Sequence, residues 1–222
     1  IKTKIIAITG SCGKTTLKEL LGNSLKKLSK VGVSPKSYNN KYGVPLSLFN
    51  LGQKNDYGVL EIGMDKKGEI DYLSNIVKPD VSVITNINYA HAKNFKNLKQ
   101  IALAKSEIIN NTKVNGIVVL NADDNFFTLH KKIANKRNLK ILSFGINNQN
   151  ANIKLISVKK NDNKFIATIR VNNLKTYFFI NNDFQNNISN ILAAIAVMSI
   201  FLNISKLNKN IFLGFKPPKG RG

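Results

Sequence analysis

A glycine-containing turn near the start of the sequence stands between an apolar run and a Lys-Thr-Thr triplet. The apolar run covers residues 5–8, the turn covers residues 9–13, and Lys14 and Thr15 open an amphipathic segment. Glycines let a backbone curl so that its N–H groups point inward at an anion, and the N-terminus of the following helix adds a favourable dipole. A lysine here can reach the β- and γ-phosphates of a nucleotide, and the threonine hydroxyl can ligate Mg²⁺.

This segment therefore predicts a loop that binds the phosphates of ATP. Ile8 stands where the common longer form of this loop has its first glycine, so the match is to a shorter Thr-Gly-x-x-Gly-Lys-Thr-Thr pattern. The alternative is a plain strand–turn–helix corner without a ligand. The residues predicted to surround the phosphates are Gly10, Ser11, Cys12, Gly13, Lys14, Thr15 and Thr16.

Two other side chains follow apolar runs and are candidates for holding a metal ion. Glu61 ends the run 59–61, where a carboxylate near a phosphate loop can bind Mg²⁺ directly or through water, and Asp65 is a weaker substitute. His91 comes shortly after the run 81–85, and it is a metal ligand or a structural residue with about equal weight. The other histidine, His130, lies in a polar helical stretch and is predicted to be on the surface.

Several amides and carboxylates also occur where strands end or helices begin. Asn121 and Asp124 follow the apolar run 117–120, and Asp124 would also serve as an ordinary helix N-cap. Asn187 and Asn190 are one turn apart at the start of a helical segment, so they share a face that can contact a purine edge or cap the helix. Lys105 by itself is one lysine among many.

The composition limits the class of protein. The chain has 222 residues, 43% of them hydrophobic, which is enough for one well-cored domain. Its net charge of +22 comes from lysines spread along the whole chain without a run of five basic residues, so we expect no nucleic-acid partner. Apolar runs are too short to insert in a membrane, and the single cysteine fits a reducing compartment, so we expect a cytoplasmic protein.

Strand-like and helix-like segments alternate over the first two thirds of the chain. This alternation predicts an α/β fold, a mostly parallel sheet with helices on both faces, in which ligands sit beyond the carboxyl ends of the strands. The predicted strands are residues 4–9, 59–62, 81–85, 117–120 and 139–144. The predicted helices are residues 14–28, 69–76, 98–110 and 124–136, with a further Pro-led helix after residue 43.

The pattern changes after Gly145. Residues 153–158, 164–171 and 176–180 are β-rich with Asn-containing turns between them, which predicts a small antiparallel meander. A helix is predicted again over residues 188–202. The end of the sequence, residues 215–222, is rich in proline, glycine and basic residues and is typical of a linker.

Taken in order, these segments resemble the central ATP-binding domain of the Mur ligase family, with a P-loop NTPase-like fold. The resemblance extends over nearly the whole chain, and seven segments in the same order carry it: residues 9–16, 39–46, 61–64 with 68–70, 85–87 with 90–91, 101–108, 121–124 and 187–194.

The resemblance implies roles for matching residues. Lys14, His91 and Lys105 would be catalytic, and Lys105 would be carbamylated, which turns a cation into a bidentate anion. Two Mg²⁺ ions are expected, with Asn187 and Asn190 contacting adenine. Asn121 and Asp124 would line the nucleotide or metal side of the cleft. The metal ligands implied are Thr15, Glu61, His91 and the Lys105 carbamate.

The implied activity is ATP-dependent amide-bond formation through an acyl phosphate in peptidoglycan precursor synthesis. Residues 39–45 and 61–64 favour the member that joins D-alanyl-D-alanine to UDP-N-acetylmuramoyl-tripeptide, acting as a monomer. The alternatives are sister ligases that add single amino acids, a folylpolyglutamate synthase-like ligase and, more remotely, a P-loop kinase or NTPase.

The same resemblance implies a domain organisation. Residues 1–214 would form the central domain, with the small β region at about 150–182, and residues 215–222 would lead to a C-terminal domain. That domain and an N-terminal UDP-sugar-binding domain would lie outside this sequence.

Overall fold

The computed structural model of the protein describes residues 3–52, 54–89, 94–182 and 187–218. Nine strands form one sheet with the order β2-β3-β1-β4-β5-β6-β7-β8-β9. The first six strands are β1 (Lys4–Thr9), β2 (Val31–Val33), β3 (Tyr57–Glu61), β4 (Val81–Ile84), β5 (Ile117–Asn121) and β6 (Lys140–Gly145). All neighbouring pairs among them are parallel, as the alternation of strands and helices predicts.

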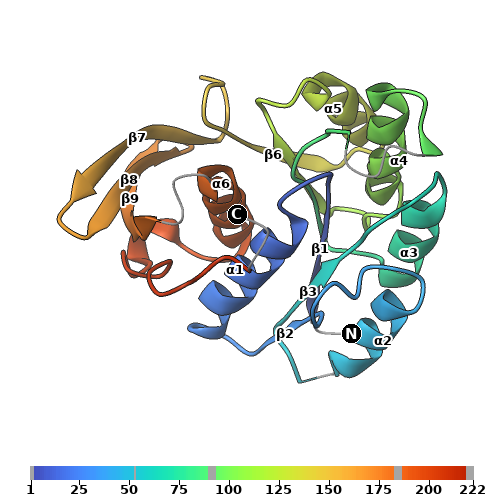
Figure 1. The fold of residues 1–222 in the computed structure, drawn as a ribbon, viewed down its shortest axis with the longest axis horizontal. Coiled ribbons are helices and arrows are strands. Elements are labelled where there is room, and N and C mark those ends of the chain that lie inside the picture. Colours follow the sequence, from blue (N-terminus) through green and yellow to red (C-terminus); the bar gives the residue numbers. More distant parts are fainter. Residues whose placement is uncertain (1–2, 53, 90–93, 183–186, 219–222) are drawn as a thin grey trace.

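Helices cover both faces of this parallel part, so its strands are buried on both sides (Figure 1). Along β1, Ile6 and Ile8 pack into the core that includes α1 and α6, whereas Ile5 and Ala7 pack into the core beneath the other helices. The helices are α1 (Lys14–Lys26), α2 (Gly43–Asn50), α3 (Glu69–Val77), α4 (Leu98–Asn110), α5 (Phe127–Lys136) and α6 (Ile188–Phe201), followed by the short 3-10 helix η3 (Ile204–Lys206). The predicted α/β class is confirmed.

The predicted antiparallel meander is also confirmed, and it continues the main sheet. Strand β7 (Ile153–Asn161) pairs with β6 in parallel over a short stretch, and β8 (Lys164–Val171) and β9 (Leu174–Ile180) follow in antiparallel register. Helix α6 packs on this part as well as on β5 and β6, so the meander shares the core of the parallel half.

Most predicted elements occur with ends shifted by one to three residues. Helix α5 begins at Phe127 and not at residue 124, because the Asp124 carboxylate accepts a hydrogen bond from the backbone N–H of Phe126 and holds a turn there. Helix α1 ends at Lys26, two residues before the predicted end. Strand β2 is not in the prediction, because three residues are too few to show a pattern.

The prediction that His130 is a surface residue is wrong. Its side chain is 2% exposed, and its Nε2 lies 3.1 Å from the carbonyl oxygen of Ala102 on α4. Burial lowers the pKa of His130 from its ordinary value. The polar neighbours of His130 in the sequence face water, while the α4–α5 contact encloses this one side chain.

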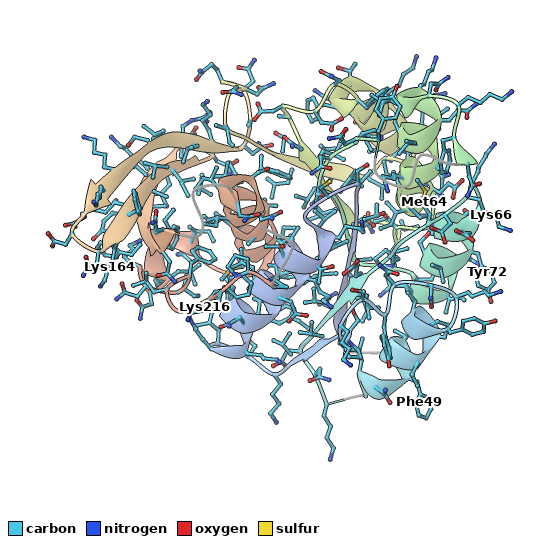
Figure 2. All side chains as sticks on the ribbon, viewed as in Figure 1. Phe49, Met64, Lys66, Tyr72, Lys164 and Lys216 are labelled. Atoms are coloured by element: carbon cyan, nitrogen blue, oxygen red, sulfur yellow. The ribbon has the colours of Figure 1, made fainter. Side chains whose placement is uncertain are left out.

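Lysine side chains occur at opposite ends of the molecule. Figure 2 labels Lys164 at the far end of the meander and Lys66 beside Met64, on the side of α3. Within the described ranges, no helix is both long and apolar enough to cross a bilayer.

Candidate functional site

The predicted phosphate-binding loop connects β1 to α1 at the carboxyl edge of the sheet. Gly10 and Gly13 have φ angles of 145° and 80°, which L side chains rarely adopt. A Cβ atom at Gly10 would lie 1.9 Å from Thr85 Oγ1, so only glycine fits there. The Lys14 ammonium folds back onto the loop, donating to the carbonyl oxygens of Gly10 at 2.8 Å and Ser11 at 3.2 Å.

The segment after β4 braces this loop from the side. Thr85 Oγ1 donates to the Cys12 carbonyl at 2.6 Å, and the Cys12 N–H donates to Asn86 Oδ1 at 2.9 Å. The Ser11 hydroxyl donates to the Asn88 carbonyl at 2.8 Å. The sequence analysis does not single out Thr85 and Asn86 as site residues, because their role depends on β4 lying next to β1 in the sheet.

Glu61 lies at the end of β3 with a buried carboxylate. Its Oε2 accepts a hydrogen bond of 2.7 Å from Thr15 Oγ1, and its Oε1 accepts one of 2.8 Å from the Asn39 side-chain amide. The side chain of Glu61 is 1% exposed. The structure thus brings together the predicted metal ligands Glu61 and Thr15. It also places Asn39 against Glu61, although the sequence assigns no role to Asn39 beyond its place in a family-like segment.

The pair of Glu61 and Thr15 suits Mg²⁺. Both contribute oxygen atoms, which this hard cation prefers, and Mg²⁺ commonly takes only one or two protein ligands beside nucleotide phosphates and water. Within the part of the chain that the structure describes, no three His, Cys, Asp or Glu side chains gather into a complete metal cage.

Lys105 reaches the same region from α4. Its side chain is 4% exposed, and it lines one pocket together with Lys14. Burial, helped by repulsion from the Lys14 ammonium, lowers the pKa of Lys105 to about 7. A large fraction of this amine is therefore uncharged at neutral pH.

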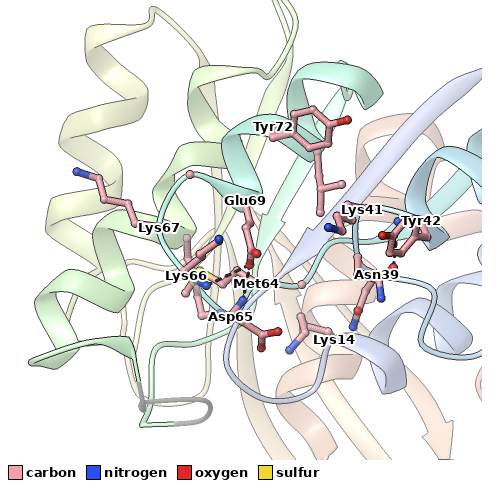
Figure 3. Close-up of a pocket in the computed structure, with 15 residues that line it drawn as sticks. Lys14, Asn39, Lys41, Tyr42, Met64, Asp65, Lys66, Lys67, Glu69 and Tyr72 are labelled. Atoms are coloured by element: carbon pink, nitrogen blue, oxygen red, sulfur yellow. Dashed lines mark hydrogen bonds between the residues drawn. The ribbon is translucent and has the colours of Figure 1, made fainter.

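The pocket extends from Lys14 over the loop between β3 and α3 and has a volume of about 710 Å³. Figure 3 shows Asn39, Asp65 and Tyr72 among the side chains along its walls. Glu69 fixes the loop, because its carboxylate accepts hydrogen bonds from the backbone N–H groups of Asp65 and Lys66. The pocket is rich in cations, contributed by Lys14, Lys41, Lys66, Lys67 and Lys105.

Asn187 and Asn190 lie at the start of α6, beside the phosphate loop. The Asn190 amide donates to Asn187 Oδ1 at 3.3 Å, and both side chains are about nine-tenths buried. A Cβ atom at Gly13 would lie 2.8 Å from Asn190 Oδ1, so glycine allows the amide to approach the loop. Among the residues that the structure describes, none accepts a hydrogen bond from the buried Nδ2 atom of Asn187.

Asn121 ends β5 and Asp124 follows it, and both connect β5 to the segment after β4. Asn121 donates to the Thr85 carbonyl at 3.1 Å, and Asp124 accepts from the Ile87 N–H at 2.7 Å. These contacts fix the segment after β4, which in turn supports the phosphate loop. Contact of Asn121 and Asp124 with nucleotide or metal stays a prediction. His91 lies outside the described residues.

Together, the parallel sheet and the loop define an α/β nucleotide-binding domain of the P-loop type. Residues 8–198 match the family model described as the Mur ligase middle domain. The chain belongs to the Mur ligase family.

Relatives that match this chain in sequence are named for the same ligase activity. The chain is 39% identical over 208 residues to the UDP-N-acetylmuramoyl-tripeptide--D-alanyl-D-alanine ligase of Buchnera aphidicola subsp. Acyrthosiphon pisum, covering 88% of this chain and 43% of that protein.

Solved structures of such relatives have the same fold. MurF from Acinetobacter baumannii matches with a TM-score of 0.89 and 29% identity, covering 99% of this chain and 48% of that one. MurF ligase from Thermotoga maritima, solved in complex with ADP, matches with a TM-score of 0.80 and 31% identity, covering 90% and 46%. The chain thus spans a little under half the length of the relatives it matches.

Proposed function

We propose that this chain is the ATP-binding part of an ADP-forming ligase that joins D-alanyl-D-alanine to UDP-N-acetylmuramoyl-tripeptide. The names of the relatives supply the substrates. The structural observation that carries the proposal is the buried Lys105 in the pocket that Lys14 lines. A P-loop kinase or NTPase needs Lys14 but leaves a second, buried lysine without a role.

The reaction begins with phosphoryl transfer. A carboxylate oxygen of the tripeptide attacks the γ-phosphorus of ATP, the bond to the β–γ bridging oxygen breaks, and ADP leaves. The amine of D-alanyl-D-alanine then attacks the acyl carbon, loses a proton and displaces phosphate. Both steps concentrate negative charge, and Lys14 would move from the loop carbonyls to the phosphates to stabilise that charge.

Magnesium would be held by Glu61 and Thr15, with His91 as the proposed further ligand. When bound, Mg²⁺ neutralises phosphate charge and orients the transferred group. Asn39 would keep the Glu61 carboxylate in place through its 2.8 Å hydrogen bond. Asn187, whose buried Nδ2 has no hydrogen-bond partner among the described residues, and Asn190 would contact the adenine.

Lys105 would act as a carbamate. Its uncharged amine adds to CO₂ and loses one proton, which leaves an anion with two oxygen atoms. Burial favours this chemistry, because a pKa of about 7 supplies the uncharged nucleophile. An anionic group beside Lys14 also replaces a repulsion between two cations with an attraction, and it can ligate the second Mg²⁺.

The proposal extends to the whole protein. Residues 1–214 would form the central domain of a cytoplasmic monomer, joined through residues 215–222 to a C-terminal domain and preceded by a domain that holds the UDP-sugar. Residues 1–222 alone would bind nucleotide and form no amide bond. Measurable amide-bond formation by residues 1–222 alone would refute this assignment of roles to the three domains.

The test is phosphate release from Mg-ATP by the full-length protein. One arm contains UDP-N-acetylmuramoyl-tripeptide with D-alanyl-D-alanine, and the other contains shorter UDP-muramoyl acceptors with single amino acids. Release only in the first arm is expected. Release only in the second arm would assign the chain to a sister ligase, and release in neither arm, with ATP binding intact, would support an NTPase.

A further inference from the structure

Lys18 is a fully buried lysine on α1, one helical turn after Lys14. Its side chain has an exposed fraction of 0%, the lowest of any lysine among the described residues. A buried ammonium gives up its hydration, which is costly unless specific partners replace the water. Lys18 is therefore not one of the solvated surface lysines of this basic chain, and its burial close to the phosphate loop depends on specific partners.

Two partners of Lys18 lie on the segment that follows β2, and a third, Glu19, is its neighbour on α1. The Lys18 Nζ donates to the carbonyl oxygen of Ser34 at 2.7 Å and also to the carbonyl oxygen of Lys36, and it lies 3.1 Å from Glu19 Oε1. Lys36 has a φ angle of 45°, in the left-handed region that a lysine rarely adopts. The ammonium thus holds a tight, unfavourable turn against α1.

That turn leads directly to the Glu61 carboxylate. The Ser34 hydroxyl accepts a hydrogen bond of 3.3 Å from the backbone N–H of Glu61, and Asn39, further along the same segment, donates to Glu61 Oε1. The Asn39 carbonyl in turn accepts a 2.7 Å hydrogen bond from the N–H of Gly63. Segment 34–39 therefore contacts Glu61 at its backbone, its carboxylate and the residues that follow it.

We propose that Lys18 is a positioning residue for the magnesium site: its ammonium holds segment 34–39 so that Asn39 directs the Glu61 carboxylate toward Thr15. The inference rests on the proposed function, since it needs Glu61 to be a magnesium ligand. Lys14 and Lys18 then have different tasks on one helix, because Lys14 faces the phosphates and Lys18 fixes the carboxylate that faces the metal.

The experiment measures binding of a non-hydrolysable ATP analogue to residues 1–222, with Mg²⁺ and with EDTA. Lys18→Met is expected to weaken the magnesium-dependent gain in affinity by about 10- to 100-fold, the usual effect of removing a group that orients a metal ligand. Affinity in EDTA should be unchanged. Lys18→Arg, which can donate to both carbonyls, should restore part of the gain, and Lys26→Met, an exposed lysine on the same helix, should behave as wild type.

Circular dichroism of each variant separates this effect from misfolding. If Lys18→Met does not fold, Lys18→Gln takes its place with the same criterion, because its amide is neutral and too short to reach both carbonyl oxygens. A folded variant that keeps the full magnesium-dependent gain in affinity would overturn the inference. Failure of both variants to fold would also overturn it, because Lys18 would then be shown only to stabilise the domain. If Mg²⁺ does not change the affinity of the wild-type chain for the nucleotide, the metal site of the proposed function is contradicted, and the inference about Lys18 falls with it.

Discussion

The parallel and antiparallel halves of this sheet differ in where they place their polar residues. Strands β1, β3, β4 and β5 all end at one edge of the sheet. There Thr15 donates to Glu61, Thr85 donates to the Cys12 carbonyl, and Asn121 donates to the Thr85 carbonyl. In the meander the strands alternate in direction, so their ends do not collect at one edge.

Lys164 of the meander and Lys209, which packs against it, have aromatic partners. The Lys164 ammonium lies 5.6 Å from the centre of the Phe179 ring, and Lys209 lies over the rings of Tyr177 and Phe178. In a chain with 34 Lys and Arg residues, topology decides which lysines can take part in chemistry. Substitutions in the two halves should therefore have unequal effects.

The largest difference is expected for Lys14→Ala against Lys164→Ala. Removing Lys14 takes away charge stabilisation at the transferred phosphoryl group, so phosphate release by the full-length ligase should fall by about 10³-fold or more. Lys164→Ala should leave the rate unchanged. Near-normal activity of the Lys14 variant would contradict the phosphate-loop assignment.

Lys105→Ala should also inactivate the full-length enzyme, by about 10²-fold or more, because a metal-facing anion is lost. Short carboxylates added to the assay should restore part of the rate, since they can occupy the place of the carbamate. Lys99→Ala, an exposed lysine on the same helix, is the control. Full activity of the Lys105 variant would remove this residue from the site.

The pH dependence of unfolding should reveal the buried amine of Lys105. Its folded pKa of about 7 is below the ordinary 10.5, so between these values the unfolded chain binds more protons and stability rises with pH. In CO₂-free urea titrations, wild type should gain up to about 1.4 kcal/mol per pH unit relative to Lys105→Met, from about pH 7 upward. Parallel curves for the two proteins would show that Lys105 titrates normally.

The smallest effect concerns Cys12, the single cysteine, which is exposed in the phosphate loop. Bound Mg-ATP should cover the loop and slow alkylation of the thiol by about 10-fold, as expected when ligand occupies most of the molecules. Mass spectrometry after timed iodoacetamide treatment measures this rate. Equal labelling with and without nucleotide would indicate that the ligand lies elsewhere.

The sequence predicts the parts of this molecule that depend on local patterns. The phosphate loop is a continuous motif, and strand β1, helix α4 and strand β8 are found with the predicted ends because their apolar periodicity is strong. Thr15, predicted as a ligand from the loop motif, and Glu61, predicted from its place at a strand end, are in direct contact.

What the sequence does not predict depends on contacts between distant segments. Asn86 braces the loop from 74 residues away. Lys18 is indistinguishable in sequence from Lys26, an exposed lysine on the same helix. His130 lies among polar residues, and its burial follows only from the packing of α5 on α4. Periodicity places a side chain on a face of its helix but does not reveal what covers that face.

The most direct test is an NMR titration of isotope-labelled residues 1–222 with Mg-ADP. We expect amide shift changes in residues 10–16, 61–63 and 187–190, with none in strands β7, β8 and β9. Omitting Mg²⁺ should abolish the changes at 61–63 and retain those in the loop. Shifts centred on the meander, or none at saturating nucleotide, would contradict the claim that the parallel edge of the sheet is an ATP site.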